Sequence, residues 1–148
     1  IRGVTTAVLH WPYEKQRTVE EWSSFSLNDM LNTRPLIQYV TDGVHRNGPG
    51  WLLRMPRLFL MDGESLSVQA SEMNYCTPRM NVGPYTHVEV GFLSTPPPSS
   101  WDSFAESAER PMPADVYCYV PLQLVQFYIG AHGGLDRERT FKDFTFRV

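Results

Sequence analysis

Cysteines and long apolar runs are both scarce in this sequence, and each shortage excludes a class of protein. The 148 residues include only two cysteines, Cys76 and Cys118, and neither belongs to a CxxC pair. Two cysteines are too few for a disulfide framework, so we expect two reduced thiols, with a single bridge between them as the alternative. No apolar stretch approaches the roughly 20 residues that a membrane-spanning helix needs, so no membrane association is expected.

Charge of one sign is not concentrated anywhere in the chain. The 13 basic and 16 acidic side chains give a formal net charge of -3 and are spread along the sequence. Extended nucleic-acid binding is therefore not expected, because it usually requires a stripe of basic residues. A hydrophobic content of 42% with 13% aromatic residues is enough to form a core. At this length, the composition predicts a single domain over residues 1–148.

Sequence motifs for nucleotide binding and catalysis are also missing. The chain has no GxxxxGK[ST] phosphate loop, no GxGxxG turn, no HExxH helix and no GxSxG elbow. His87 and Glu89 match half of a zinc deaminase signature, but no Pro-Cys-x-x-Cys follows them. Isolated histidines are more often structural than metal-binding, so we predict neither a metal site nor a cofactor.

The sequence does contain a series of short strand patterns, in which β-branched and aromatic residues are bounded by prolines, glycines and polar clusters. They predict strands at Val4 to Trp11, Pro35 to Thr41, both arms of a hairpin within Trp51 to Ser71, Tyr85 to Phe92, Asp115 to Val120 and Thr140 to Val148. Capping signals and helical spacing predict helices over Val19 to Leu31, Trp101 to Ala108 and Pro121 to His132. The expected fold is α+β, with a largely antiparallel sheet of about six strands and two or three helices on one face.

The hairpin turn is assigned to Asp62-Gly63, a dipeptide that accepts the positive φ angles of a two-residue turn. In the strand that follows, Leu66, Val68 and Ala70 alternate with polar residues, so their side is predicted to be core. Thr86, Val88, Val90 and Phe92 are expected to form the same kind of face in the strand from Tyr85. The opposite, polar side of these strands is left free to bind a ligand.

A candidate binding site follows if these two strands are neighbours. Their polar sides would then meet, and the loop between them would add groups that can bind an anion or stack on a ring. The tyrosines of the Asp115 strand would point to the same side if that strand joins the sheet. The predicted ligand-binding residues are Arg57, Gln69, Tyr75, Arg79, His87, Glu89, Tyr117 and Tyr119.

Arg57 needs a separate explanation because it lies within an apolar strand pattern. Alternation places it on the same side as Met55 and Phe59, where a buried guanidinium would need an anionic partner. With a two-residue turn it stands opposite Val68, which offers no carboxylate. Either Pro56 introduces a bulge that leaves Arg57 exposed, or Arg57 holds a bound phosphate or carboxylate.

Three functions are compatible with these features. The first is a non-enzymatic binding protein that recognises or sequesters a small polar ligand, such as a nucleotide or another anion, on the free sheet face. The second is a protein-interaction or assembly module that forms a homo-oligomer. The third is a hydrolase in which Cys76 is activated by His87 and Glu89, although no family-specific signature surrounds this cysteine.

Several segments between Trp51 and Leu135 are similar to small uncharacterised proteins of bacteriophages and bacteria. These segments read LSVQAS, YCTPR, GPYTHVEVGF and YVPLQLV, followed by HGG. The resemblance points to no named family, implies no activity and assigns no catalytic residue. It implies a cytoplasmic setting in a bacterium or a phage-infected cell, and therefore reduced thiols.

Overall fold

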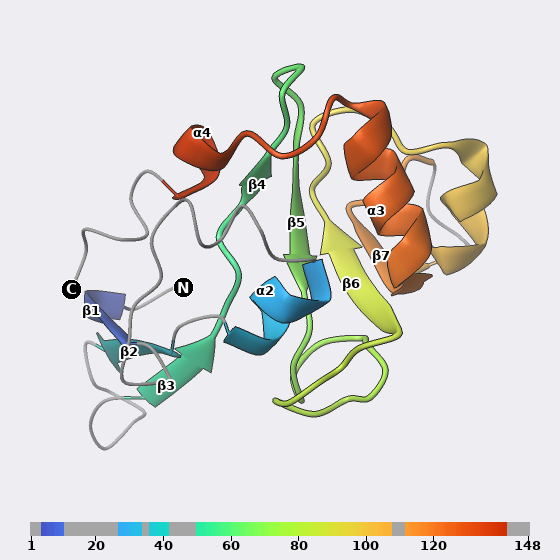
Figure 1. Cartoon of the computed structure of the whole chain (residues 1–148). Coiled ribbons are helices and arrows are strands. Elements are labelled where there is room, and N and C mark those ends of the chain that lie inside the picture. The colour runs from blue at the N-terminus through green and yellow to red at the C-terminus, as the bar shows by residue number, and fades with distance from the viewer. Residues whose placement is uncertain (1–3, 11–26, 34–35, 42–49, 108–111, 142–148) are drawn as a thin grey trace.

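The computed structural model describes residues 4–10, 27–33, 36–41, 50–107 and 112–141, and these form an α+β fold with two antiparallel sheets (Figure 1). The first sheet has the order β1 (Val4–His10), β2 (Leu36–Thr41), β3 (Gly50–Leu53). The second has the order β4 (Leu58–Phe59), β5 (Ser65–Gln69), β6 (His87–Gly91), β7 (Val116–Pro121). The helices are α2 (Leu27–Thr33), the 3-10 helix η1 (Ser99–Phe104), α3 (Leu122–Ala131) and α4 (Arg137–Phe141). None of the helices in these ranges is long and apolar enough to span a bilayer.

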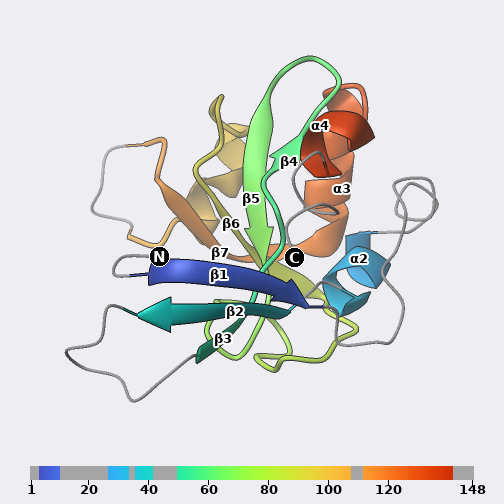
Figure 2. The ribbon, with the colours of Figure 1, turned by 90° about the vertical axis from the view of Figure 1, so that its left-hand side faces the viewer.

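The strands are divided between two sheets instead of forming one sheet of about six strands. The chain leaves the first sheet after Leu53 and enters the second at Leu58, and Pro56 lies between them. Proline has no N–H to donate to a ladder, so it interrupts the strand pattern that begins at Trp51. Figure 2 shows β1 and β2 running across the direction of β5.

Several predicted elements are present close to their predicted places, namely β1, β2, β5, β6, β7 and α3. The helix expected over Val19 to Leu31 is observed as α2, and residues 19–26 lie outside the described residues. The helix expected from Trp101 is the 3-10 helix η1. The strand expected from Thr140 is wrong at its start, because Thr140 belongs to α4. Its remainder, residues 142–148, also lies outside the described residues. The side chain of Asp136 accepts a hydrogen bond from the Arg139 N–H (3.1 Å) and so favours a helix there.

The hydrophobic core lies between the four-stranded sheet and the helices α2 and α3. The predicted core side of β5 is confirmed, since Leu66 and Val68 are fully buried and Ala70 is almost so. β6, α2, α3 and η1 add buried side chains, among them Val88, Val90, Met30, Leu31, Val125, Tyr128 and Trp101. Burying each large apolar side chain contributes roughly 1.5–3 kcal/mol. The helices α2 and α3 therefore lie against the same face of the four-stranded sheet (Figure 1).

The β4–β5 hairpin turns over three residues, Met61 to Gly63, and the predicted two-residue turn is wrong. The Leu60 N–H donates to the Glu64 carbonyl (2.8 Å), and Leu58 pairs with Leu66. Gly63 has a φ of 92°, as three-residue hairpin loops require at their last position. The pairing is thus displaced by one residue from the predicted register.

Alanine at Gly63 should lower the free energy of unfolding by about 1–2 kcal/mol, because left-handed backbone is unfavourable for a residue with a Cβ. The matched control is Gly130→Ala in α3, where the added Cβ meets no atom within 4 Å and φ is not positive. That variant should gain about 0.5–1 kcal/mol from helix propensity. Urea denaturation measures both, and two effects of the same sign would contradict the turn geometry.

Both outer strands of the four-stranded sheet are hydrogen-bonded on their far side by segments outside its ladder. Beside β4, the Asp136 N–H donates to the Phe59 carbonyl (2.7 Å) in the segment that leads into α4. Beside β7, the Glu106 N–H donates to the Val116 carbonyl (2.9 Å) just after η1. The sheet is therefore closed laterally by two connecting segments.

Candidate functional site

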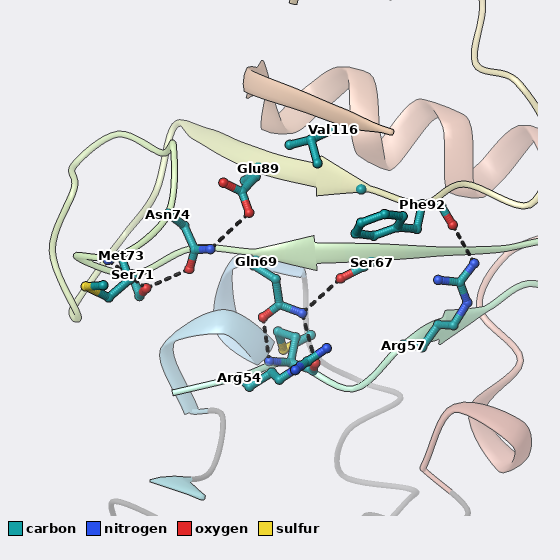
Figure 3. Close-up of a pocket in the computed structure, with 12 residues that line it drawn as sticks. Arg54, Arg57, Ser67, Gln69, Ser71, Met73, Asn74, Glu89, Phe92 and Val116 are labelled. Atoms are coloured by element: carbon teal, nitrogen blue, oxygen red, sulfur yellow. Dashed lines mark hydrogen bonds between the residues drawn. The ribbon is translucent and has the colours of Figure 1, made fainter. Parts of the chain in front are cut away.

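The face of β5 and β6 opposite the buried side chains carries a hollow of about 390 Å³ (Figure 3), which we call the sheet-face hollow. Its floor comes from the polar sides of the two strands, because alternate side chains of a strand point to opposite faces. The prediction that these two strands are neighbours is confirmed. They pair antiparallel, with Gln69 opposite Glu89 and Ser67 opposite Gly91. The wall is completed by residues from three places. They are Arg54, Met55 and Arg57 before β4, Ser71, Met73 and Asn74 after β5, and Phe92 and Val116 at the ends of β6 and β7.

Gln69 holds the segment between the two sheets against the floor of this hollow. Its amide oxygen accepts from the Met55 N–H (2.9 Å), and its amide nitrogen donates to the Met55 carbonyl (3.0 Å). The same nitrogen lies 3.1 Å from the Ser67 hydroxyl oxygen. The Gln69 amide thus forms hydrogen bonds within the protein. By holding Met55, it also holds the preceding residue, Arg54, at the rim of the hollow.

Glu89 fixes the loop that follows β5. One carboxylate oxygen accepts from the Asn74 side-chain amide (3.0 Å) and the other from the Tyr75 N–H (3.1 Å). The Ser71 hydroxyl donates to the Asn74 amide oxygen (2.6 Å), so the loop is tied to the sheet at two points (Figure 3). Hydrogen bonds to an ionised carboxylate are worth about 1.5–3 kcal/mol each, which makes Glu89 a structural anchor.

Arg57 immediately precedes β4, is half-buried and does not share the core side with Met55, as the alternative with an interruption at Pro56 predicts. The irregular segment around Pro56 resets the register, and Met55, Leu58 and Leu60 take the core positions. Its Nε donates to the Ser65 hydroxyl (2.9 Å) and one Nη to the Phe92 carbonyl (2.5 Å).

Two guanidinium groups at this hollow have no anionic partner among the residues that the structure describes. Among the described residues, neither Arg54 nor Arg57 forms an ion pair with a carboxylate. A guanidinium carries five N–H donors in a planar fork, and Arg57 uses two of its groups within the protein. Donors therefore remain for a ligand, and Arg54 is exposed at the same rim.

Phe92 lines the hollow. The prediction that it belongs to the core is wrong. Its backbone has a φ of 49° and its side chain is 61% exposed. The Phe92 N–H donates to the Asp115 carbonyl (2.7 Å), which holds the chain in this unusual conformation as it leaves β6. The ring lies near Ser67 in Figure 3, so an aromatic surface borders the polar floor.

Tyr117 and Tyr119 do not share a face, because β7 contains a bulge. Val88 pairs with Val120 and Val90 pairs with Tyr117, which leaves one extra residue on β7. Tyr119 has a φ of 53° and is 42% exposed. Tyr117 is fully buried, packs edge-on against Trp101 at 5.9 Å, and its hydroxyl accepts from the Ala114 N–H (3.1 Å). The placement of Tyr117 in the binding site is therefore wrong.

A second hollow of about 600 Å³, here called the tyrosine hollow, lies beside β7. It is lined by Tyr75, His87, Ser103, Phe104, Ala105, Glu106, Cys118, Tyr119 and Pro121. The Tyr75 and Tyr119 ring centroids are 6.0 Å apart. Burial raises the pKa of the Cys118 thiol, and the charges of Glu106 and Glu89 raise it further.

The eight predicted residues are thus distributed over different places. Arg57, Gln69 and Glu89 line the sheet-face hollow. Tyr75, His87 and Tyr119 line the tyrosine hollow. Arg79 lines neither, and its guanidinium lies 5.2 Å from the centre of the Tyr75 ring. Tyr117 belongs to the core.

Several residues that line the sheet-face hollow were not among the predicted binding residues, including Arg54, Met73, Asn74 and Phe92. Asn74 had a usable signal, since an asparagine shortly after a strand often closes a turn with its side chain. Arg54 gave none, and strand alternation assigned Phe92 to the core.

Comparisons of the chain with protein-family models, with curated proteins and with solved structures find no match. Within the described ranges, no group of three or more His, Cys, Asp or Glu side chains could hold a metal ion.

Proposed function

We propose that the protein binds a small anionic ligand with a planar ring, such as a nucleotide, in the sheet-face hollow. The observation that carries the proposal is the pair of guanidinium groups, Arg54 and Arg57, at the rim of a hollow that Phe92 also borders. Guanidinium forks match the geometry of phosphate oxygens, and exposed aromatic rings stack on planar ligands.

Recognition is favoured over catalysis by the state of the other polar groups in this hollow. The Glu89 carboxylate and the Gln69 amide are engaged in hydrogen bonds within the protein. A general base or nucleophile needs an accessible atom near the reacting group. The arginines and the ring, in contrast, present accessible surface to a ligand.

A thermal-shift titration with a nucleoside monophosphate, the matching nucleoside and inorganic phosphate tests the proposal. We expect the monophosphate to stabilise the protein most, because it alone engages both the ring and the arginines. At a hundredfold excess over its Kd, a ligand adds about 2.7 kcal/mol to the free energy of unfolding. The proposal fails if no phosphate compound stabilises the protein even at high concentration.

A second candidate, a homo-oligomeric assembly module, is favoured by apolar side chains exposed around the loop after β5. Met73 is 75% exposed, Met80 58% and Val82 68%, and Phe92 lies at the neighbouring hollow. Exposed apolar patches often mark interaction surfaces. Size-exclusion chromatography with light scattering tests this candidate: Phe92→Glu should dissociate the oligomer, and a wild-type monomer at all concentrations would count against it.

A Cys76-dependent hydrolase is the proposal that the geometry supports least. The Cys76 side chain is 1% exposed, and its sulfur lies 3.2 Å from the Ser71 carbonyl and 3.3 Å from the Pro78 carbonyl. Reactive cysteines are usually accessible and lie in electropositive surroundings. Cys76→Ser would abolish an activity only if this thiol were the nucleophile.

A further inference from the structure

The tyrosine hollow presents two partly exposed aromatic rings that are held in place through their backbones. The Tyr119 N–H donates to the Tyr75 carbonyl (3.1 Å), and the Tyr75 N–H donates to Glu89 (3.1 Å). The rings are tilted by 54° with their centroids 6.0 Å apart. The positive φ of Tyr119 brings its ring out of the sheet at the β7 bulge. Two electron-rich surfaces are therefore arranged around one hollow before any ligand binds.

Rings in this arrangement attract cations. A positive charge within about 6 Å of a tyrosine ring centre is drawn to the electron-rich face. The protein already contains one such contact, between the Arg79 guanidinium and the Tyr75 ring at 5.2 Å. Arg79 does not line the hollow, so Tyr119 is left available to a ligand.

The electrostatic environment of the hollow is also suited to a positive charge. Glu106 is exposed and contributes to its wall. Burial raises the pKa of the Cys118 thiol at this wall, and the charges of Glu106 and Glu89 raise it further. Phe104, Ala105 and Pro121 supply apolar surface for the carbon atoms of a ligand.

We infer that the tyrosine hollow is a binding site for an organic cation, such as a quaternary ammonium group, held against the Tyr119 ring and neutralised by Glu106. This site is separate from the anion site proposed above. The residues that line the two hollows are different, and Glu89, which lines the sheet-face hollow, contributes here by accepting the hydrogen bond from the Tyr75 N–H.

Titration with choline, followed by NMR of protein labelled at tyrosine, tests this inference. The control ligand is the neutral analogue in which carbon replaces the ammonium nitrogen. Because the shapes are the same, any preference measures the positive charge, and we expect choline to bind at least about fivefold more tightly. Equal binding of the two ligands, or no saturable shift with choline, would overturn the inference.

Matched variants locate the site. Glu106→Gln and Tyr119→Leu should each weaken choline binding by about fivefold, since each removes one attraction for the charge. The controls are Glu138→Gln, which makes the same change at an exposed position on α4, and Phe127→Leu, which removes an exposed aromatic ring on α3. Circular dichroism confirms folding, and Glu106→Gln changes only the end of an exposed side chain. If the controls weaken binding as much, or if neither site variant weakens it, the assignment is wrong.

Discussion

Replacing Tyr117 by alanine should lower the free energy of unfolding by about 3–5 kcal/mol, as is usual when a large aromatic side chain is removed from a core. The Tyr117 ring is fully buried against Trp101, and its hydroxyl accepts the Ala114 N–H. Removing the ring leaves a cavity and an unpaired donor, and both effects destabilise the native state. Urea denaturation at equilibrium measures the difference.

The control is the same substitution two residues later. Tyr119→Ala should change the free energy of unfolding by less than about 1 kcal/mol, because surface substitutions rarely have larger effects. The ring is 42% exposed and its main packing partner is Tyr75. In a regular strand the two residues would share a face and give similar losses. Comparable losses for both variants would therefore contradict the bulge in β7.

Replacing Arg57 by glutamine should weaken nucleotide binding by about 10- to 100-fold, the range expected when a charged hydrogen-bonding partner is lost. Glutamine keeps hydrogen-bonding capacity but removes the charge and the planar fork. Isothermal titration with the nucleoside monophosphate that gives the largest thermal shift measures the change. Arg137→Gln, an exposed arginine on α4, is the matched control and should bind as the wild type does.

The binding role of Arg57 must be separated from its structural role. Arg57→Gln also loses the bonds to Ser65 and Phe92, so it should be somewhat less stable. Arg54→Gln provides the separation, because Arg54 is exposed and its charge can be removed with little effect on stability. Reduced affinity in both variants supports the anion site. If Arg57→Gln loses only stability and Arg54→Gln changes nothing, Arg57 is a structural residue.

The polar floor of the sheet-face hollow could be predicted because it depends on local alternation. Leu66, Val68 and Ala70 repeat every second residue, which places Ser67 and Gln69 on the other face. The pairing with β6 follows from the same pattern in the next strand. The side chains that these two strands contribute to the hollow could therefore be predicted from the sequence.

The remaining parts depend on interruptions whose effect is set by the whole fold. A bulge in β7 separates Tyr117 from Tyr119, yet VYCYV reads as an uninterrupted strand. Likewise, the positive φ of Phe92 is held by a hydrogen bond to the Asp115 carbonyl, which lies 23 residues later in the chain. Pro56 did predict an interruption of the strand, but it gave no indication that the chain enters a second sheet there. Sequence alternation cannot predict contacts between segments that are distant in the chain.

The lateral closure of the four-stranded sheet limits how copies of this protein can associate. A bare outer strand offers unpaired N–H and C=O groups, on which a second chain can add as a further strand and begin aggregation. Here the Phe59 and Val116 carbonyls on the outer strands already accept hydrogen bonds from Asp136 and Glu106. Strand-on-strand growth at these two edges would therefore first require the connecting segments to detach.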